Sequence, residues 1–216
     1  MNHSHADTVL IELHYLPSIA YFIHLQPFRK IILEVNENYT KQTYRNRCYI
    51  LTANKVQALS IPVSKDGNKT KLKEISLDYT QRWQNNHWRA IQSAYGKTPF
   101  FDFFADYFHD ILYRKYKFLI DLNVDLLTKC LELLNWHDKE ITLTSSYVKA
   151  TESQWVDFRG IIDIKSMPPN DKIEGYTKYN QIFGKNFVSN LSVIDLLFCE
   201  GPNANMILGQ SSLIHR

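Results

Sequence analysis

Two apolar runs near the N-terminus, separated by a short helical segment, constrain the fold of this chain most. Residues 8–13 and 30–35 are rich in Val, Ile and Leu, the continuous apolar pattern of strands that are buried on both faces. Pro17 interrupts the pattern between them, and residues 19–25 suit a short helix. Because parallel strands need a crossover connection, this order predicts a parallel β-α-β unit.

The segments that follow predict a β-hairpin and then helices. Residues 47–53 and 56–63 have the composition of strands, and Asn54-Lys55 between them suits a tight turn. A short strand is expected over 72–77. From Trp83 the apolar spacing becomes helical. The later elements expected are helices from Trp83, from Pro99 and over 119–134, a strand over 141–145 and a short helix over 191–199.

These elements predict a single α/β domain. We expect a small mixed sheet that begins with the β-α-β unit, an attached β-hairpin and a cluster of three central helices. The domain is expected over residues 9–208, with a disordered tail at 1–8 and a second tail at 209–216.

The bulk composition is that of an ordinary globular protein and excludes some classes of function. A length of 216 residues suits one sizeable core, and 44% hydrophobic with 22% charged residues is typical. A net charge of +3 is too mild to favour a nucleic-acid partner. No apolar run reaches the roughly 18 residues that span a bilayer, and the first residues lack a signal-peptide pattern. Three widely separated cysteines fit a reducing compartment, so a cytoplasmic location is expected.

The segment 41–47 concentrates positive hydrogen-bond donors. If it is extended, Lys41, Arg45 and Arg47 share one face with Thr43. The opposite face then carries the other members of the segment, Gln42, Tyr44 and Asn46, together with Cys48. No acidic residue lies between Asn38 and Lys65 to balance these cations. This pattern favours a clamp for phosphate or carboxylate. The alternative is an edge strand whose cations discourage aggregation.

Two further residues are candidates for catalysis. His87 lies on the apolar face of its predicted helix with Trp83, where it acts either as a general base or as a hydrogen-bonded core histidine. Asp195 is a lone carboxylate in an apolar helix and needs partners, which the basic segment could supply; alternatively it lies on the one wet face of that helix. Cys48 is a poor candidate nucleophile because no histidine and acid are paired with it in the sequence. The chain contains no P-loop and no GxGxxG, its histidines predict no metal site, and no cofactor is identified.

Several blocks of this sequence together resemble the WbqC-like family, in the branch common in Bacteroidetes. The N-terminal blocks are Tyr15-Leu16-Pro17, Tyr21-Phe22, Glu37-Asn38-Tyr39, the run from Lys41 to Cys48, and Ser60-Ile61-Pro62-Val63. The later blocks are Trp83, His87 to Ile91, Ser93-Ala94-Tyr95, Pro99-Phe100-Phe101, Tyr179, Gln181, Phe183, Asn190-Leu191-Ser192, Asp195 to Phe198 and Glu200-Gly201-Pro202. Two positions depart from the family pattern. Glu12 stands where the opening motif usually has glutamine, and Asp163 to Ser166 replace a Pro-Lys-Lys-like element.

The resemblance implies a role in the assembly of bacterial surface polysaccharide, because family members occur in O-antigen gene clusters. The reaction suggested for the family is the transfer of an acyl or aminoacyl group, such as glycine, to a sugar. The implied partner is a nucleotide-linked or lipid-linked sugar. In this hypothesis the cations of segment 41–47 hold phosphate or carboxylate, and Tyr15 and Tyr44 line the sugar. His87 is then the general base, and Asp195 orients one of the cations. The alternative is a non-catalytic module of the same pathway that binds a nucleotide sugar or acts as a scaffold.

Overall fold

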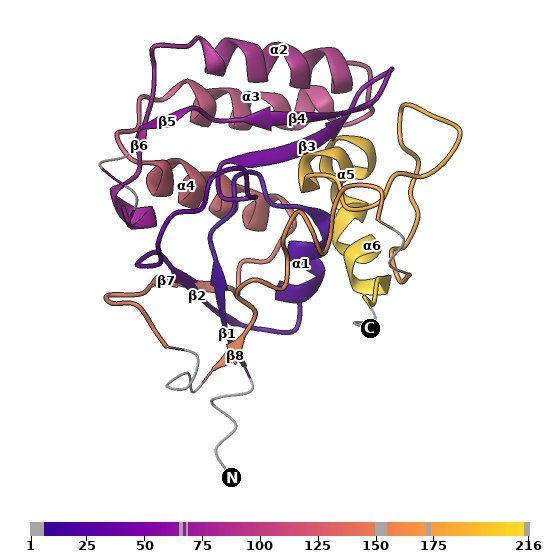
Figure 1. Cartoon of the computed structure of the whole chain (residues 1–216). Helices are drawn as coiled ribbons and strands as arrows, with labels where there is room; N and C mark the ends of the chain where they lie inside the picture. The colour runs from indigo at the N-terminus through magenta and orange to yellow at the C-terminus, as the bar shows by residue number, and fades with distance from the viewer. Residues whose placement is uncertain (1–6, 65–66, 68, 150–154, 172–173, 214–216) are drawn as a thin grey trace.

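The computed structural model describes residues 7–64, 67, 69–149, 155–171 and 174–213 (Figure 1). Its main sheet has four strands in the order β7-β2-β1-β8, and each neighbouring pair is parallel. The strands are β1 (Thr8–Glu12), β2 (Lys30–Glu34), β7 (Glu140–Leu143) and β8 (Val156–Asp157).

The predicted β-α-β unit is confirmed. Helix α1 (Ile19–Leu25) connects β1 to β2, and the two strands pair from Thr8 with Lys30 to Glu12 with Glu34. Every residue of β1 is buried, which explains why its sequence is apolar from Val9 to Ile11. β8 was missed in the sequence, because a two-residue strand has too short a pattern to recognise.

The antiparallel strands form two ribbons that are separate from the parallel sheet. The predicted hairpin consists of β3 (Arg47–Leu51) and β4 (Val56–Ser60). A second pair joins β5 (Val63–Ser64) to β6 (Ser76–Leu77). Part of the strand expected over 72–77 is instead the single-turn 3-10 helix η1 (Leu72–Glu74). The expected mixture of parallel and antiparallel strands is therefore distributed over separate sheets.

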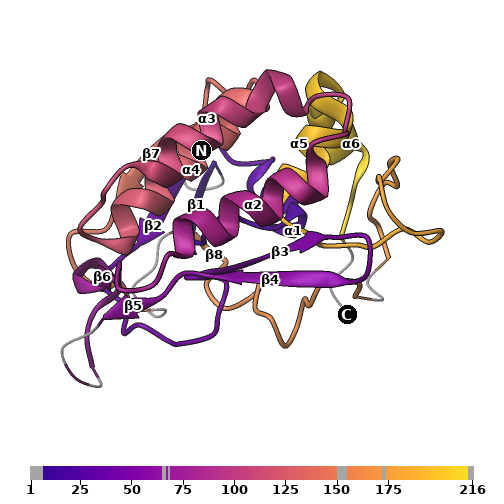
Figure 2. The same ribbon diagram turned by 90° about the horizontal axis from the view of Figure 1, so that it is seen from above.

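The cluster of three central helices is also confirmed. It comprises α2 (Trp83–Tyr95), α3 (Phe101–Tyr113) and α4 (Leu119–Leu133). Figures 1 and 2 show α2 and α3 side by side near the β3–β4 hairpin, with α4 between them and the parallel sheet. The aromatic stripe of α3 is only partly buried in the core. Phe108 is buried, but Tyr107 is 48% exposed, because the stripe is wider than the face that α3 buries.

The C-terminal helices pack between the helical cluster and α1. Helix α5 (Val193–Glu200) is apolar and almost wholly buried, and it packs against α1, α2, α3 and α4. It is followed by the 3-10 turn η3 (Gly201–Asn203) and by α6 (Ala204–Gln210), which the sequence analysis did not predict. No helix in the described ranges is both long and apolar enough to cross a membrane.

Candidate functional site

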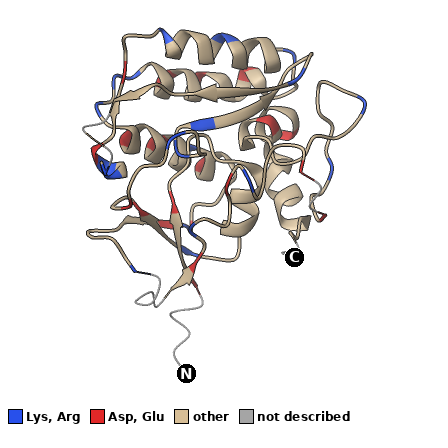
Figure 3. Ribbon diagram, viewed as in Figure 1, with Lys and Arg blue, Asp and Glu red and all other residues tan. Residues whose placement is uncertain are grey.

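The candidate site lies at the carboxyl edge of the parallel sheet. β2 and β8 lie on opposite sides of β1, so the order of the strands along the chain reverses beside β1. Open parallel sheets bind ligands at such a reversal, outside the carboxyl ends of the strands. Here the edge carries three acids, because Glu12 ends β1, Glu34 ends β2 and Asp157 ends β8. Figure 3 shows red segments on the strands of the parallel sheet, with blue segments near them, in the lower middle of the molecule.

Glu12 is a buried carboxylate at the centre of this edge. Its exposure is 1%, and both of its oxygens accept the backbone N–H of Gly160 at 3.1 Å. Gly160 has a φ of 76°, a conformation that glycine adopts without strain, just beyond β8. Burial alone would raise the pKa of Glu12, but its contact with His14 and the positive charge of Arg45 outweigh burial and lower that pKa.

His14 is a buried histidine beside these acids. Its exposure is 0%, and neither ring nitrogen has a hydrogen-bond partner among the described residues. The nearest acid is Glu12, whose Oε1 lies 3.6 Å from His14 Nε2. The rings of Tyr21 and Tyr44 flank the imidazole, with centroids 4.9 and 5.4 Å away. Buried polar side chains almost always have partners, so an unsatisfied one marks a position held for a ligand, a water or a proton.

Arg45 brings the basic segment onto the same acids. Its Nε and one terminal nitrogen donate to the two oxygens of Glu37 at 2.6 and 2.7 Å, and a terminal nitrogen lies 3.8 Å from Glu12 Oε1. The side chain is only 11% exposed. Burial would lower the pKa of the guanidinium, but the hydrogen bonds and charge of Glu37 and the charge of Glu12 raise it. Arg45 is therefore a permanently charged member of a buried network, and Glu37 neutralises it.

Segment 41–47 is not extended, so its side chains do not alternate between two faces. Residues 41–46 form consecutive turns, Gln42 has a φ of 59°, and the strand begins only at Arg47. Lys41 and Gln42 are exposed, whereas Asn46 is buried. The local reason is that turn geometry lets Arg45 fold back onto Glu37, an acid that precedes the segment in sequence.

Hydrogen bonds from two directions hold this turn segment in place. Asn46 Nδ2 donates to the carbonyl of Ile61 at 3.0 Å, and Arg47 Nε donates to Ser60 Oγ at 2.8 Å. The buried Asn123 of α4 donates to the carbonyl of Arg45 at 2.8 Å. The segment is thus fixed by the hairpin and by the helical cluster.

The two tyrosines of the predicted site occupy different surroundings. Tyr44 covers His14, and its hydroxyl donates to the carbonyl of Met167 at 2.7 Å. Burial, followed by the nearby Tyr49 and acidic groups, raises the pKa of Tyr44. Tyr15 is fully buried, and its hydroxyl is 2.9 Å from His87 Nδ1.

Both ring nitrogens of His87 are engaged inside the protein. Nε2 lies 3.2 Å from the carbonyl oxygen of Ser60, so Nε2 carries the proton and donates it. Nδ1 then accepts the hydroxyl of Tyr15. Burial lowers the pKa of His87 to about 4, which leaves the ring neutral at pH 7. This arrangement favours the core-histidine interpretation, and a general-base role for His87 stays a prediction.

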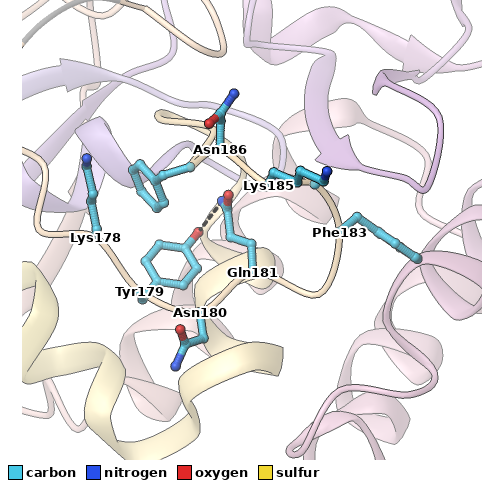
Figure 4. Close-up of a pocket in the computed structure, with 9 residues that line it drawn as sticks. Lys178, Tyr179, Asn180, Gln181, Phe183, Lys185 and Asn186 are labelled. Carbon is cyan, nitrogen blue, oxygen red and sulfur yellow. Dashed lines mark hydrogen bonds between the residues drawn. The ribbon is translucent and has the colours of Figure 1, made fainter.

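Asp195 lies on α5 with an exposure of 0% and contacts a different part of the chain. Its Oδ2 accepts the hydroxyl of Tyr179 at 2.5 Å and Nε2 of Gln181 at 3.1 Å. Burial raises the pKa of this carboxyl. Figure 4 shows Tyr179 and Gln181 turned toward each other at the base of a loop over residues 178–187. Asp195 is therefore bonded by Tyr179 and Gln181 of that loop, and by Tyr95 at the end of α2, and not by the basic segment.

The structure thus brings together some of the residues predicted for the site, and it adds residues that were not predicted. Arg45 and Tyr44 meet Glu12, Glu37 and His14 at the carboxyl edge. His14 could have been found as a polar residue two positions beyond the last residue of the central strand, on the same side as Glu12. No group of three His, Cys, Asp or Glu side chains in the described ranges is arranged to hold a metal ion. Burial raises the pKa of the Cys48 thiol, which disfavours a nucleophilic role.

Comparison with known proteins places this chain in a family. The WbqC-like protein family matches residues 13–167 and 170–207, which include most of the carboxyl edge. The uncharacterized protein Rv1507c of Mycobacterium tuberculosis is 27% identical over 219 residues, covering 90% of this chain and 94% of that protein. No solved structure matches. Because the family match spans nearly the whole described chain, this protein belongs to the WbqC-like protein family.

Proposed function

We propose that this protein is an enzyme of bacterial surface polysaccharide biosynthesis, including that of O-antigen. It transfers an acyl or aminoacyl group, such as glycine, to a sugar that is linked to a nucleotide or lipid carrier, and it acts in the cytoplasm. Membership of the WbqC-like family supports the pathway. The observation that carries the proposal is His14, a buried imidazole with both nitrogens unpartnered among the described residues, beside a buried carboxylate at the strand-order reversal.

In this proposal His14 is the general base. An amino or hydroxyl group of the sugar attacks the carbonyl carbon of the acyl donor, and a new N–C or O–C bond forms as the bond to the leaving group breaks. The sugar's proton passes to a ring nitrogen of His14 and then to the leaving group. Glu12, 3.6 Å from Nε2, stabilises the imidazolium that forms between these transfers.

The other predicted residues take roles that fit their contacts. Arg45 holds Glu12 and Glu37 in place, while the exposed Lys41 and the half-buried Arg47 are proposed to bind phosphate or carboxylate of the substrate. Tyr44 covers His14, so the substrate reaches the imidazole only when Tyr44 moves. The hydrogen bond from its hydroxyl to Met167 is the contact that must open.

Product analysis tests this proposal. Purified protein is incubated with amino-sugar nucleotides and either acyl-CoA donors or glycine with ATP, and the sugar is analysed by mass spectrometry. We expect one added acyl or aminoacyl group, and no addition with His14→Ala. His137→Ala, at an exposed histidine of the loop after α4, is the matched control. An unmodified sugar with every donor class would contradict the transfer reaction.

A non-catalytic role remains the alternative, and one observation favours it. Elsewhere along this edge the polar groups are already paired. The carboxylate of Glu34, at 0% exposure, accepts hydrogen bonds from the side chains of Arg159 and Thr144 and from the backbone N–H groups of Asn36 and Val148. Such a closed network can serve as a scaffold that only binds a nucleotide sugar. Saturable binding of a nucleotide sugar that is recovered chemically unchanged with all donors would favour this alternative.

A further inference from the structure

The loop over residues 178–187 borders an open surface cavity that is separate from the carboxyl edge. Its volume is about 470 Å³, and all of its lining residues come from this one stretch of chain (Figure 4). The loop precedes α5 and, as Figure 1 shows, extends from the body of the molecule beside α5 and α6. The cavity is large enough for a small charged group with part of a sugar or base.

The chemistry of the lining suits an anion. Lys178 and Lys185, which Figure 4 shows on opposite sides of the loop, carry ammonium groups, and Asn180 and Asn186 carry side-chain amides. All four residues are exposed, and no Asp or Glu is among the lining residues. Ammonium and amide N–H groups are donors, so this lining complements a group that has many acceptor oxygens and negative charge, as a phosphate has.

Gln181 gives the loop a defined shape. Its Nε2 donates to the carbonyl of Val188 at 2.9 Å, and its Oε1 accepts the N–H of Val188 at 2.8 Å, so one side chain joins the two sides of the loop. Gln181 and Tyr179 both bind the buried carboxylate of Asp195. The ring of Phe187 meets that of Tyr179 edge-on at 5.2 Å. A cavity wall fixed before the ligand arrives costs less ordering entropy on binding.

We propose that this cavity binds the diphosphate of an activated sugar, through Lys178 and Lys185. The identification of the diphosphate with a sugar carrier rests on the proposed function, whereas the binding itself does not need His14. The same chain continues from Val188 to the buried Asn190, whose Nδ2 lies 3.5 Å from the hydroxyl of Tyr44. Asp195 is then a positioning residue that fixes the loop.

Titration calorimetry with inorganic pyrophosphate tests this proposal at low ionic strength, where exposed charges are least screened. We expect saturable binding by the wild-type protein and a loss of about tenfold or more in affinity with Lys178→Gln/Lys185→Gln, since each lost charge-assisted contact is worth about a factor of ten. Lys55→Gln/Lys97→Gln, at two exposed lysines of the hairpin turn and of the end of α2, removes the same charge and should keep wild-type affinity.

Further arms identify the carrier and separate the two proposals. Uridine diphosphate is titrated as a nucleotide probe and farnesyl diphosphate as a lipid probe. The probe that binds with the higher affinity identifies whether the diphosphate comes from a nucleotide carrier or a lipid carrier. His14→Ala should bind pyrophosphate as the wild type does, even if no transfer reaction is ever detected. No saturable binding of pyrophosphate, or an equal loss in both double variants, would overturn the proposal.

Discussion

The pH dependence of stability should reveal that His87 is buried as a neutral ring. Its pKa falls from the ordinary 6.5 to about 4 in the folded protein because the ring is desolvated. In the unfolded chain His87 therefore binds a proton below about pH 6.5, whereas in the folded protein it binds that proton only below about pH 4. The stability that depends on this neutral ring is present above pH 6.5 and is lost as the pH falls from 6.5 toward 4.

The size of this effect follows from proton linkage. With those two pKa values, lowering the pH from 7 to 5 costs about 2 kcal/mol of unfolding free energy through His87 alone. His87→Gln cannot titrate, so its stability should fall by about 2 kcal/mol less than that of the wild type over this range. The variant should be less stable at pH 7, because Tyr15 and Ser60 lose a well-placed partner.

Urea denaturation at pH 7, 6 and 5, followed by far-ultraviolet circular dichroism, measures these free energies. Comparing each variant with the wild type cancels the titration of the other groups. His137→Gln, which removes an exposed histidine, is the control and should keep the wild-type slope. If His87→Gln loses as much stability as the wild type between pH 7 and 5, the ring is not held neutral and the reasoning fails.

Three further perturbations test separate parts of the structure. Glu37→Gln leaves the buried guanidinium of Arg45 without its bidentate partner and should lower the free energy of unfolding in urea by about 2 kcal/mol; an unchanged midpoint of urea unfolding would contradict the pairing. Asp195→Leu removes the acceptor of Tyr179 and should speed tryptic cleavage within the 178–187 loop; unchanged cleavage would refute the anchoring. Gly201→Ala places a Cβ 2.4 Å from a ring atom of Phe100 at a φ of 53°, so it should lower the melting temperature by several degrees; an unaltered melting curve would exclude this clash.

The fold could be predicted where apolar periodicity is long and uninterrupted. The run through β1, α1 and β2 identified the crossover unit, and the helices of the central cluster appear with nearly the expected bounds. Short elements such as β8 escaped prediction, because two residues carry no periodicity and their pairing with β1 depends on contacts far apart in sequence.

The site was predictable only in part, because its geometry depends on side chains that meet across the chain. The basic segment pointed to Arg45, but the absence of acids after Asn38 concealed Glu37, which lies just before it. His14 gave little signal alone, since its significance comes from burial without partners. Asp195 was correctly expected to need partners, yet Tyr179 and Gln181 lie in a loop, where no helix or strand periodicity indicates which side chains meet Asp195.

The most direct test of the central claim, that His14 beside Glu12 is the reactive base of the carboxyl edge, is the rate of sugar acylation by His14→Gln. Loss of a general base costs about a hundredfold or more. We therefore predict such a loss for His14→Gln with its folded state intact by circular dichroism, and a rate within about threefold of the wild type for His87→Gln, measured at pH 7 well below its melting temperature. Wild-type turnover by His14→Gln, together with a collapse of turnover in His87→Gln, would contradict the account and return the role of base to His87.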